Sequence, residues 1–143
     1  READAVVSLT QAALTPLAAV APRVPVDVIP CCADLSLFRP PTASERQAAR
    51  ERLGIASEAR VPAYLGSIGT WYMLAEMLDA FAVERTRSPG ATMLWITPDD
   101  PALIRAEAAH QGLPEASLVI RSADRGEVRS LLAAADYGLF FIK

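Results

Sequence analysis

Lysine, histidine and cysteine are scarce in this sequence of 143 residues. Thirteen of the 14 basic residues are arginine, the only lysine is Lys143, and the only histidine is His110. So few nitrogen and sulfur ligands argue against a zinc-type metal centre, which needs His and Cys at set spacings. The 14 basic residues are outnumbered by 17 acidic ones, which gives a net charge of -3. That balance argues against a protein that holds nucleic acid through its phosphates.

The two cysteines, Cys31 and Cys32, are adjacent in the chain. Neighbouring residues lie too close together for an ordinary structural disulfide, so we expect reduced thiols and a cytoplasmic compartment. Without a CxxC spacing or a second ligand pair, we expect no metal at these thiols. We predict instead that both side chains are small, partly buried hydrophobic groups in a linker.

Long apolar runs are also absent. No stretch of 18 or more uninterrupted apolar residues occurs, so we predict no transmembrane helix, and the start of the chain has no signal-peptide pattern. Apolar residues nevertheless make up 52% of the sequence, which is enough for a packed core and excludes intrinsic disorder. The sequence starts with Arg1 rather than Met and stops close to an apolar run, so we expect a piece of a longer protein.

The sequence does contain a regular alternation of short β-branched runs and helical stretches. We expect strands at residues 4–10, 26–30, 61–65, 92–97, 117–121 and 137–142. We expect helices at residues 11–20, 45–53, 71–86, 101–111 and 125–135. Apolar strands connected by helices are typical of a parallel sheet. The predicted fold class is therefore α/β, a Rossmann-like parallel sheet with helices on both faces.

A proline-rich segment at residues 30–41 interrupts this alternation, and we place a linker there. The predicted domains are residues 1–38 and residues 39–143. Just after the boundary, Ser44 with Gln47 three residues later has the form of a helix capping box.

One glycine turn stands where a ligand would bind. Ligands of parallel α/β sheets bind beyond the carboxyl ends of the strands, and Gly66-Ser-Ile-Gly-Thr70 follows a predicted strand directly. Its glycines let the backbone approach a ligand, and a helix predicted to begin at Trp71 would direct its N-terminus at a phosphate. The dinucleotide and P-loop patterns are not matched, so a plain turn without a ligand is the alternative. Trp71 and Tyr72 either stack on a ligand or pack in the core.

Other polar residues at strand and helix ends have simpler interpretations. Arg121 ends a predicted strand, where it either pairs with a phosphate or is an ordinary surface arginine. Asp99 and Asp100 form a carboxylate pair, but helix capping by Asp100 before Pro101 explains it without acid–base or metal chemistry. His110 has no assignable Ser, Cys or Asp partner. The catalytic residues are therefore unknown, and no metal is expected.

Several motifs, taken in order, resemble family 4 retaining glycosyltransferases of the GT-B fold. Ala3–Thr10 is similar to the last strand of that family's N-terminal domain. Val28-Ile-Pro-Cys-Cys-Ala-Asp-Leu-Ser-Leu-Phe-Arg-Pro40 resembles its interdomain segment, whose usual form is V-I-P-N-G-V-D-x-x-x-F-x-P. Ala63–Gly69 resembles the first strand and glycine loop of the nucleotide-sugar-binding domain, and Ala133–Phe140 resembles the A-A-D-x-x-x-x strand. The resemblance covers nearly the whole chain and implies a partial GT-B C-terminal domain plus the tail of the N-terminal domain.

The resemblance also implies a donor site. In the family the glycine loop faces the donor phosphates, and the implied donor-binding residues are Gly66, Ser67, Gly69, Thr70, Thr97, Arg121 and Ser122. The family's G-R-x-x-x-x-K pattern is not matched, because Ser67 and Tyr72 stand where Arg and Lys are usual. Charge compensation for a diphosphate must then come from elsewhere. The glutamate-containing donor motif would follow beyond the last residue.

The implied activity is metal-independent sugar transfer with retention, from a nucleotide-sugar donor to a saccharide or lipid-linked acceptor. No cofactor is implied. We expect the whole protein to serve bacterial polysaccharide or glycoconjugate synthesis, in the cytoplasm or peripherally at the inner membrane, and the piece alone to be inactive. One alternative is a non-catalytic Rossmann-like module for protein interaction or homodimerisation. A GT-B sugar-nucleotide epimerase is another, and would need cleft carboxylates that this stretch does not clearly offer.

Overall fold

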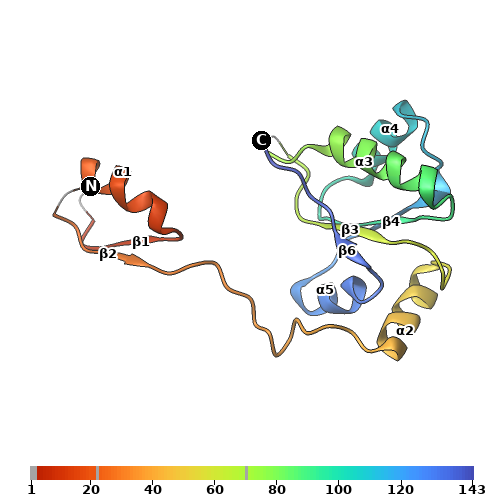
Figure 1. Ribbon diagram of the computed structural model, residues 1–143, viewed down its shortest axis with the longest axis horizontal. Coiled ribbons are helices and arrows are strands. Elements are labelled where there is room, and N and C mark those ends of the chain that lie inside the picture. Colours follow the sequence, from red (N-terminus) through yellow and green to blue (C-terminus); the bar gives the residue numbers. More distant parts are fainter. Residues whose placement is uncertain (1–2, 22, 70) are drawn as a thin grey trace. The chain divides into compact units, whose positions relative to one another are not determined.

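The computed structural model describes residues 3–21, 23–69 and 71–143. The chain separates into two compact units, residues 1–38 and residues 39–143, which we call unit 1 and unit 2 (Figure 1). Each unit is described by itself below.

Unit 1 is a small α/β arrangement with two strands. Its elements are β1 (Val6–Ser8), a 3₁₀ turn (Gln11–Ala13), α1 (Leu14–Val20) and β2 (Val26–Val28). The two strands are parallel, with Val6 opposite Val26 and Ser8 opposite Val28. Val7 is 59% exposed and Leu9, just after β1, is 61% exposed, so the first strand has one open face within this unit.

Unit 2 is built on a four-stranded parallel sheet. Its strands are β3 (Pro62–Leu65), β4 (Met93–Ile96), β5 (Leu118–Arg121) and β6 (Tyr137–Gly138). Their order across the sheet is β5-β4-β3-β6, and every neighbouring pair is parallel. This arrangement confirms the predicted α/β fold with a Rossmann-like parallel sheet.

Helices cover both faces of this sheet, as predicted (Figure 1). They are α2 (Ala43–Leu53), α3 (Leu74–Arg87), α4 (Pro101–His110) and α5 (Arg125–Leu132), with a short 3₁₀ turn (Glu115–Ser117) before β5. Successive strand residues point to opposite faces, so Leu94 and Ile96 pack with α2 and α5, whereas Met93 and Trp95 pack with α3 and α4. Trp95 is fully buried, as expected for a core residue.

The start of α2 differs from the predicted capping box. Thr42 is the N-cap: its Oγ1 accepts a hydrogen bond from the Glu45 N–H at 3.2 Å, and the Glu45 carboxylate accepts one from the Thr42 N–H at 2.7 Å. The assignment to Ser44 and Gln47 is therefore wrong by two residues. The same S/T-x-x-E/Q form fits Thr42 and Glu45 equally well.

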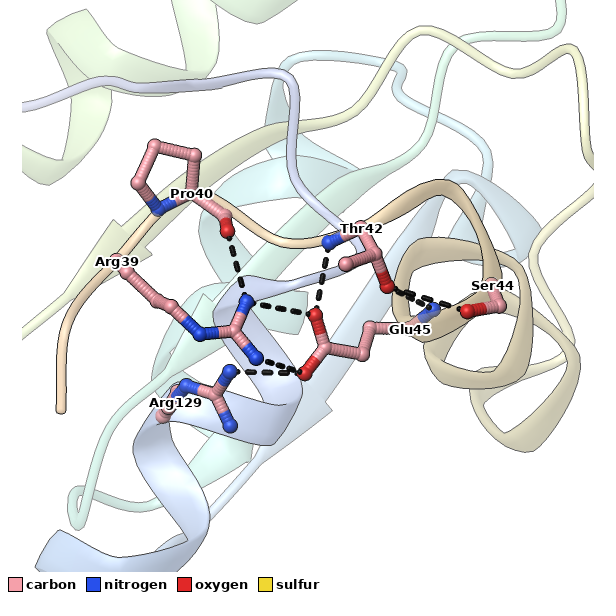
Figure 2. A network of polar contacts seen from close by, with 6 residues as sticks. All are labelled: Arg39, Pro40, Thr42, Ser44, Glu45 and Arg129. Carbon is pink, nitrogen blue, oxygen red and sulfur yellow. Dashed lines mark hydrogen bonds and ion pairs between the residues drawn. The ribbon is translucent and has the colours of Figure 1, made fainter.

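The Glu45 carboxylate also joins three parts of unit 2 (Figure 2). Arg39, at the start of the unit, and Arg129, on α5, each place an Nη2 2.8 Å from Glu45 Oε1. The hydrogen bond from Arg39 is the main cause that holds the pKa of Glu45 well below its usual range, followed by the capping bond from Thr42 and the bond from Arg129. The beginning of the unit is thereby attached to both α2 and α5.

A second carboxylate, that of Asp136, connects the amino ends of β3 and β6. Asp136 accepts hydrogen bonds from Arg46 Nη1 at 2.8 Å, from Arg50 Nη2 at 3.1 Å and from the Val61 N–H at 2.8 Å. Arg50 is buried, and it also donates to the carbonyls of Ala134 and Ser57. Every nitrogen of this buried guanidinium therefore has a partner.

Two predicted elements have different bounds at the carboxyl edge of the sheet. The helix predicted from Trp71 begins at Leu74, and the strand predicted over 137–142 is only β6. Residues 141–143 turn to pair in antiparallel fashion with residues 71–73: the Met73 N–H donates to Phe141 O at 3.1 Å, and the Lys143 N–H donates to Trp71 O at 3.0 Å. These strand-like bonds keep residues 71–73 out of the helix.

The segment that contains the cysteines is also different from expectation. Cys31 and Cys32 are both exposed and free. They follow β2 in a stretch without regular secondary structure, so no neighbouring element covers them. The prediction that they are partly buried is wrong.

Candidate functional site

The carboxyl ends of β3, β4 and β5 lie side by side in unit 2. The Gly66 N–H donates to Ile96 O at 3.0 Å, and the Thr97 N–H donates to Arg121 O at 2.9 Å. The structure therefore brings together the backbones of three predicted donor-binding residues, Gly66, Thr97 and Arg121. We call this row, together with the turn at residues 66–69, the carboxyl edge.

The turn after β3 is held in a conformation that requires glycine. Gly66 has φ +148°, and a Cβ there would lie 3.1 Å from the Tyr64 hydroxyl. That hydroxyl donates to Ser67 O at 2.6 Å. Burial is the main cause that raises the pKa of Tyr64 to about 12, with Tyr72 and Asp99 adding to it, so the phenol is protonated at neutral pH and remains a donor.

Asp99 binds the other side of the peptide group between Ser67 and Ile68. Its carboxylate accepts the N–H of Ile68, so the carbonyl of Ser67 and the N–H of Ile68 both have partners. Asp99 is itself positioned by Thr97, whose Oγ1 accepts the Asp99 N–H at 3.2 Å. In contrast, the N–H groups of Ser67 and Gly69 have no hydrogen-bond partner among the residues that the structure describes. These two N–H groups are what the turn can offer an anion.

Sequence reasoning missed the role of Asp99. The signal that could have found it is Thr-Pro-Asp directly after a strand, since a Thr hydroxyl two residues ahead of an Asp commonly forms a local turn. Thr97 is only 2% exposed, so its side chain serves the turn. Asp100 caps α4 as expected, and its Oδ1 accepts the Ala102 N–H at 2.9 Å.

The other predicted site residues are exposed, are in contact with a neighbouring residue or lie outside the described residues. Thr70 lies outside the described residues. The side chains of Arg121 and Ser122 are exposed, and Arg121 Nη1 donates to the carbonyl of its neighbour Ile120 at 2.8 Å. Trp71 is 69% exposed, so it is no core residue. Tyr72 packs edge-on against Tyr64, with ring centroids 6.0 Å apart.

Neither a metal cluster nor a histidine-based catalytic group is evident at this edge. In the described ranges, no three or more His, Cys, Asp or Glu side chains gather as a metal would require. His110 is exposed at the end of α4, with its Nδ1 3.7 Å from Glu107 Oε1. The carboxyl edge presents two backbone N–H donors, those of Ser67 and Gly69, and the carboxylate of Asp99.

Several solved structures have the same fold. HepE from Anabaena, in complex with UDP and glucose, matches with a TM-score of 0.74 and 20% identity over 95% of this chain and 37% of its own. WaaG, a glycosyltransferase involved in lipopolysaccharide biosynthesis, matches with a TM-score of 0.74 and 19% identity over 92% of this chain and 36% of its own. A glycosyltransferase from Rickettsia africae matches with a TM-score of 0.72 and 14% identity over 94% of this chain and 37% of its own.

This chain has the fold of the GT-B glycosyltransferases. It spans little more than a third of the length of these GT-B neighbours. No protein-family model matches the sequence, and no curated protein matches it. No described helix is long and apolar enough to cross a membrane.

A hollow of about 380 Å³ lies elsewhere on unit 2, along α2. Arg46 and Arg50 line it, but both guanidinium groups are hydrogen-bonded to Asp136 and to backbone carbonyls. Because Asp136 lies at the amino end of β6, this hollow is on the side of the sheet away from the carboxyl edge. It is a weaker candidate than the glycine turn.

Proposed function

We propose that this chain is part of a glycosyltransferase that uses a nucleotide-sugar donor, and that unit 2 supplies the donor-binding side. One observation carries the proposal. At the carboxyl edge of a sheet with the GT-B fold, the N–H groups of Ser67 and Gly69 have no hydrogen-bond partner among the described residues. Unpaired N–H groups in a turn between strand and helix suit a phosphate. HepE, which shares the fold, was solved with UDP and glucose.

The proposed donor-binding residues at the carboxyl edge are Gly66, Ser67, Gly69, Thr97 and Arg121. We add Ser122, which follows Arg121 in the sequence, and Thr70, which lies outside the described residues. Their role is to hold the diphosphate and to stabilise it as it departs, which N–H donors and cations do in the absence of a metal. We propose transfer with retention to a saccharide or lipid-linked acceptor in bacterial polysaccharide or glycoconjugate synthesis. The enzyme would act in the cytoplasm or at the inner membrane surface.

The chain alone should bind nucleotide weakly and transfer no sugar, since it spans only 36–37% of the length of its neighbours. Calorimetric titration with UDP, GDP, ADP and their glucose esters tests this. Binding by at least one diphosphate supports the proposal, and no heat with any of them contradicts it.

A matched pair of glycine variants locates the binding. Gly66→Ala introduces a Cβ at a positive φ, 3.1 Å from the Tyr64 hydroxyl, whereas a Cβ at Gly90 meets nothing within 4 Å. We expect Gly66→Ala to weaken nucleotide binding at least about tenfold and Gly90→Ala to leave it unchanged. Equal affinity of the two variants would place the nucleotide elsewhere.

A non-catalytic module for protein interaction or dimerisation is the second candidate. Phe140, Phe141 and Ile142 are 62%, 38% and 54% exposed just after β6, and the outer side of β6 is an open sheet edge. Light scattering on a size-exclusion column distinguishes the two functions. A stable dimer that gives no nucleotide heat favours the module.

A further inference from the structure

Asp99 places a negative charge inside the glycine turn. Its carboxylate already accepts the N–H of Ile68, next to the free N–H groups of Ser67 and Gly69. No described Arg or Lys side chain lies within ion-pair distance of this carboxylate. A phosphate bound to the turn would therefore approach an uncompensated anion.

We propose that the Asp99 carboxylate makes the carboxyl edge favour a nucleotide sugar over the free nucleoside diphosphate. The inference rests on the proposed function and assigns one residue to it. A terminal phosphate ionises a second time near pH 6, so the free diphosphate carries about one more negative charge than its sugar ester. Asp99 therefore repels the product of transfer more than the donor.

The expected size of the discrimination follows from Coulomb's law. One additional charge at about 5 Å in a water-like dielectric changes a binding constant about fourfold, and a less polar surrounding increases this factor. We expect Asp99 to change the ratio of the two dissociation constants by at least that amount.

The test measures the dissociation constants of UDP, GDP and ADP, and of their glucose esters, at pH 8. Asp99→Asn keeps an oxygen that can accept the Ile68 N–H but removes the charge. We expect it to tighten diphosphate binding about four times more than binding of the glucose ester.

Two controls separate charge at the turn from general effects. Asp100→Asn removes a neighbouring carboxylate but keeps an oxygen for the Ala102 N–H. Arg87→Gln removes an exposed cation at the far end of α3, about 20 Å from its start at 1.5 Å per residue. Both should leave the ratio unchanged. Asp99→Ser is a second uncharged acceptor in case Asp99→Asn lowers the unfolding midpoint.

The outcomes distinguish this inference from the function on which it rests. If no diphosphate binds the unmodified chain or Asp99→Asn, the proposed function fails and the inference with it. If a diphosphate binds but both Asp99 variants leave the ratio unchanged, the function stands and the inference is wrong. A ratio that changes equally in Asp100→Asn would also overturn it.

Discussion

The two units of this chain differ greatly in how many apolar side chains each of them buries. Unit 2 buries two clusters of apolar side chains, one on each face of a four-stranded sheet. In unit 1, the only described residue that is buried is Ser8, and its two strands leave Val7 and Leu9 open. The stability of the chain should therefore reside in unit 2, because burial of apolar surface is the main favourable contribution to folding.

This difference also explains where a ligand site can be built. The carboxyl edge of unit 2 follows strands that pack between two layers of helices, so Gly66 at its positive φ and the Asp99 turn can be held in place. Unit 1 has no comparable support among its described residues. Three substitution pairs test the contrast. Two of them compare a packed position of unit 2 with an open position of unit 1, and the third compares a surface glutamate that two arginines hold with an exposed glutamate.

The largest expected effect comes from a matched pair of leucines. Leu94 is fully buried in β4, whereas Leu9 follows β1 and is 61% exposed. Leu94→Ala should lower the free energy of unfolding by about 2–5 kcal/mol, since it leaves a cavity in the core. Leu9→Ala should change it by less than about 0.5 kcal/mol. Urea unfolding followed by tryptophan fluorescence measures both, and similar losses would show that unit 1 contributes to the same cooperative core.

An aspartate pair should give a smaller effect. Asp136→Ala leaves the buried Arg50 without its carboxylate and the Val61 N–H without its acceptor. We expect a loss of about 2 kcal/mol, less than the roughly 3–5 kcal/mol for a fully buried pair, because the Asp136 side chain is 21% exposed. Asp27→Ala, at an exposed position of β2, should be nearly neutral in the same urea experiment. A neutral Asp136→Ala would mean that the Arg50 bonds to carbonyls suffice.

The sequence predicted the fold well where periodic burial decides it. Met93–Ile96 is a continuous apolar run, which is typical of a strand covered on both faces, and its side chains pack alternately against two helix layers. The glycine turn was also found, although its function as a site stays a prediction.

The sequence could not predict contacts between distant segments. The start of α3 depends on backbone bonds from residues 141–143 to residues 71–73, which no local propensity reveals. From the sequence, we explained the Asp99–Asp100 pair by helix capping alone. In the structure, the Asp99 carboxylate accepts a hydrogen bond from the N–H of Ile68, 31 residues earlier in the chain. The negative charge at the glycine turn depends on the contact of Asp99 with Ile68, so it emerged only from the structure.

The smallest effect concerns Glu45, which is outside the core. Its pKa is lowered in the folded state, mainly by the hydrogen bond from Arg39. A carboxylate with a lowered folded-state pKa stabilises the fold fully at pH values above its unfolded pKa of about 4.3. This contribution is lost as the pH falls from that value towards the folded-state pKa. Glu45→Gln should therefore lower the urea midpoint at pH 7, by less than the two preceding variants, and have less effect at pH 3.

Glu58→Gln is the matched control, because Glu58 is an exposed carboxylate between α2 and β3. It should leave the urea midpoint unchanged at pH 7. Because Arg39 and Arg129 hold Glu45 at the surface, added salt should reduce the effect of Glu45→Gln at pH 7. A Glu45→Gln effect that is equal at pH 3 and pH 7 would mean that the capping bonds at the start of α2, rather than the charge of Glu45, account for its contribution.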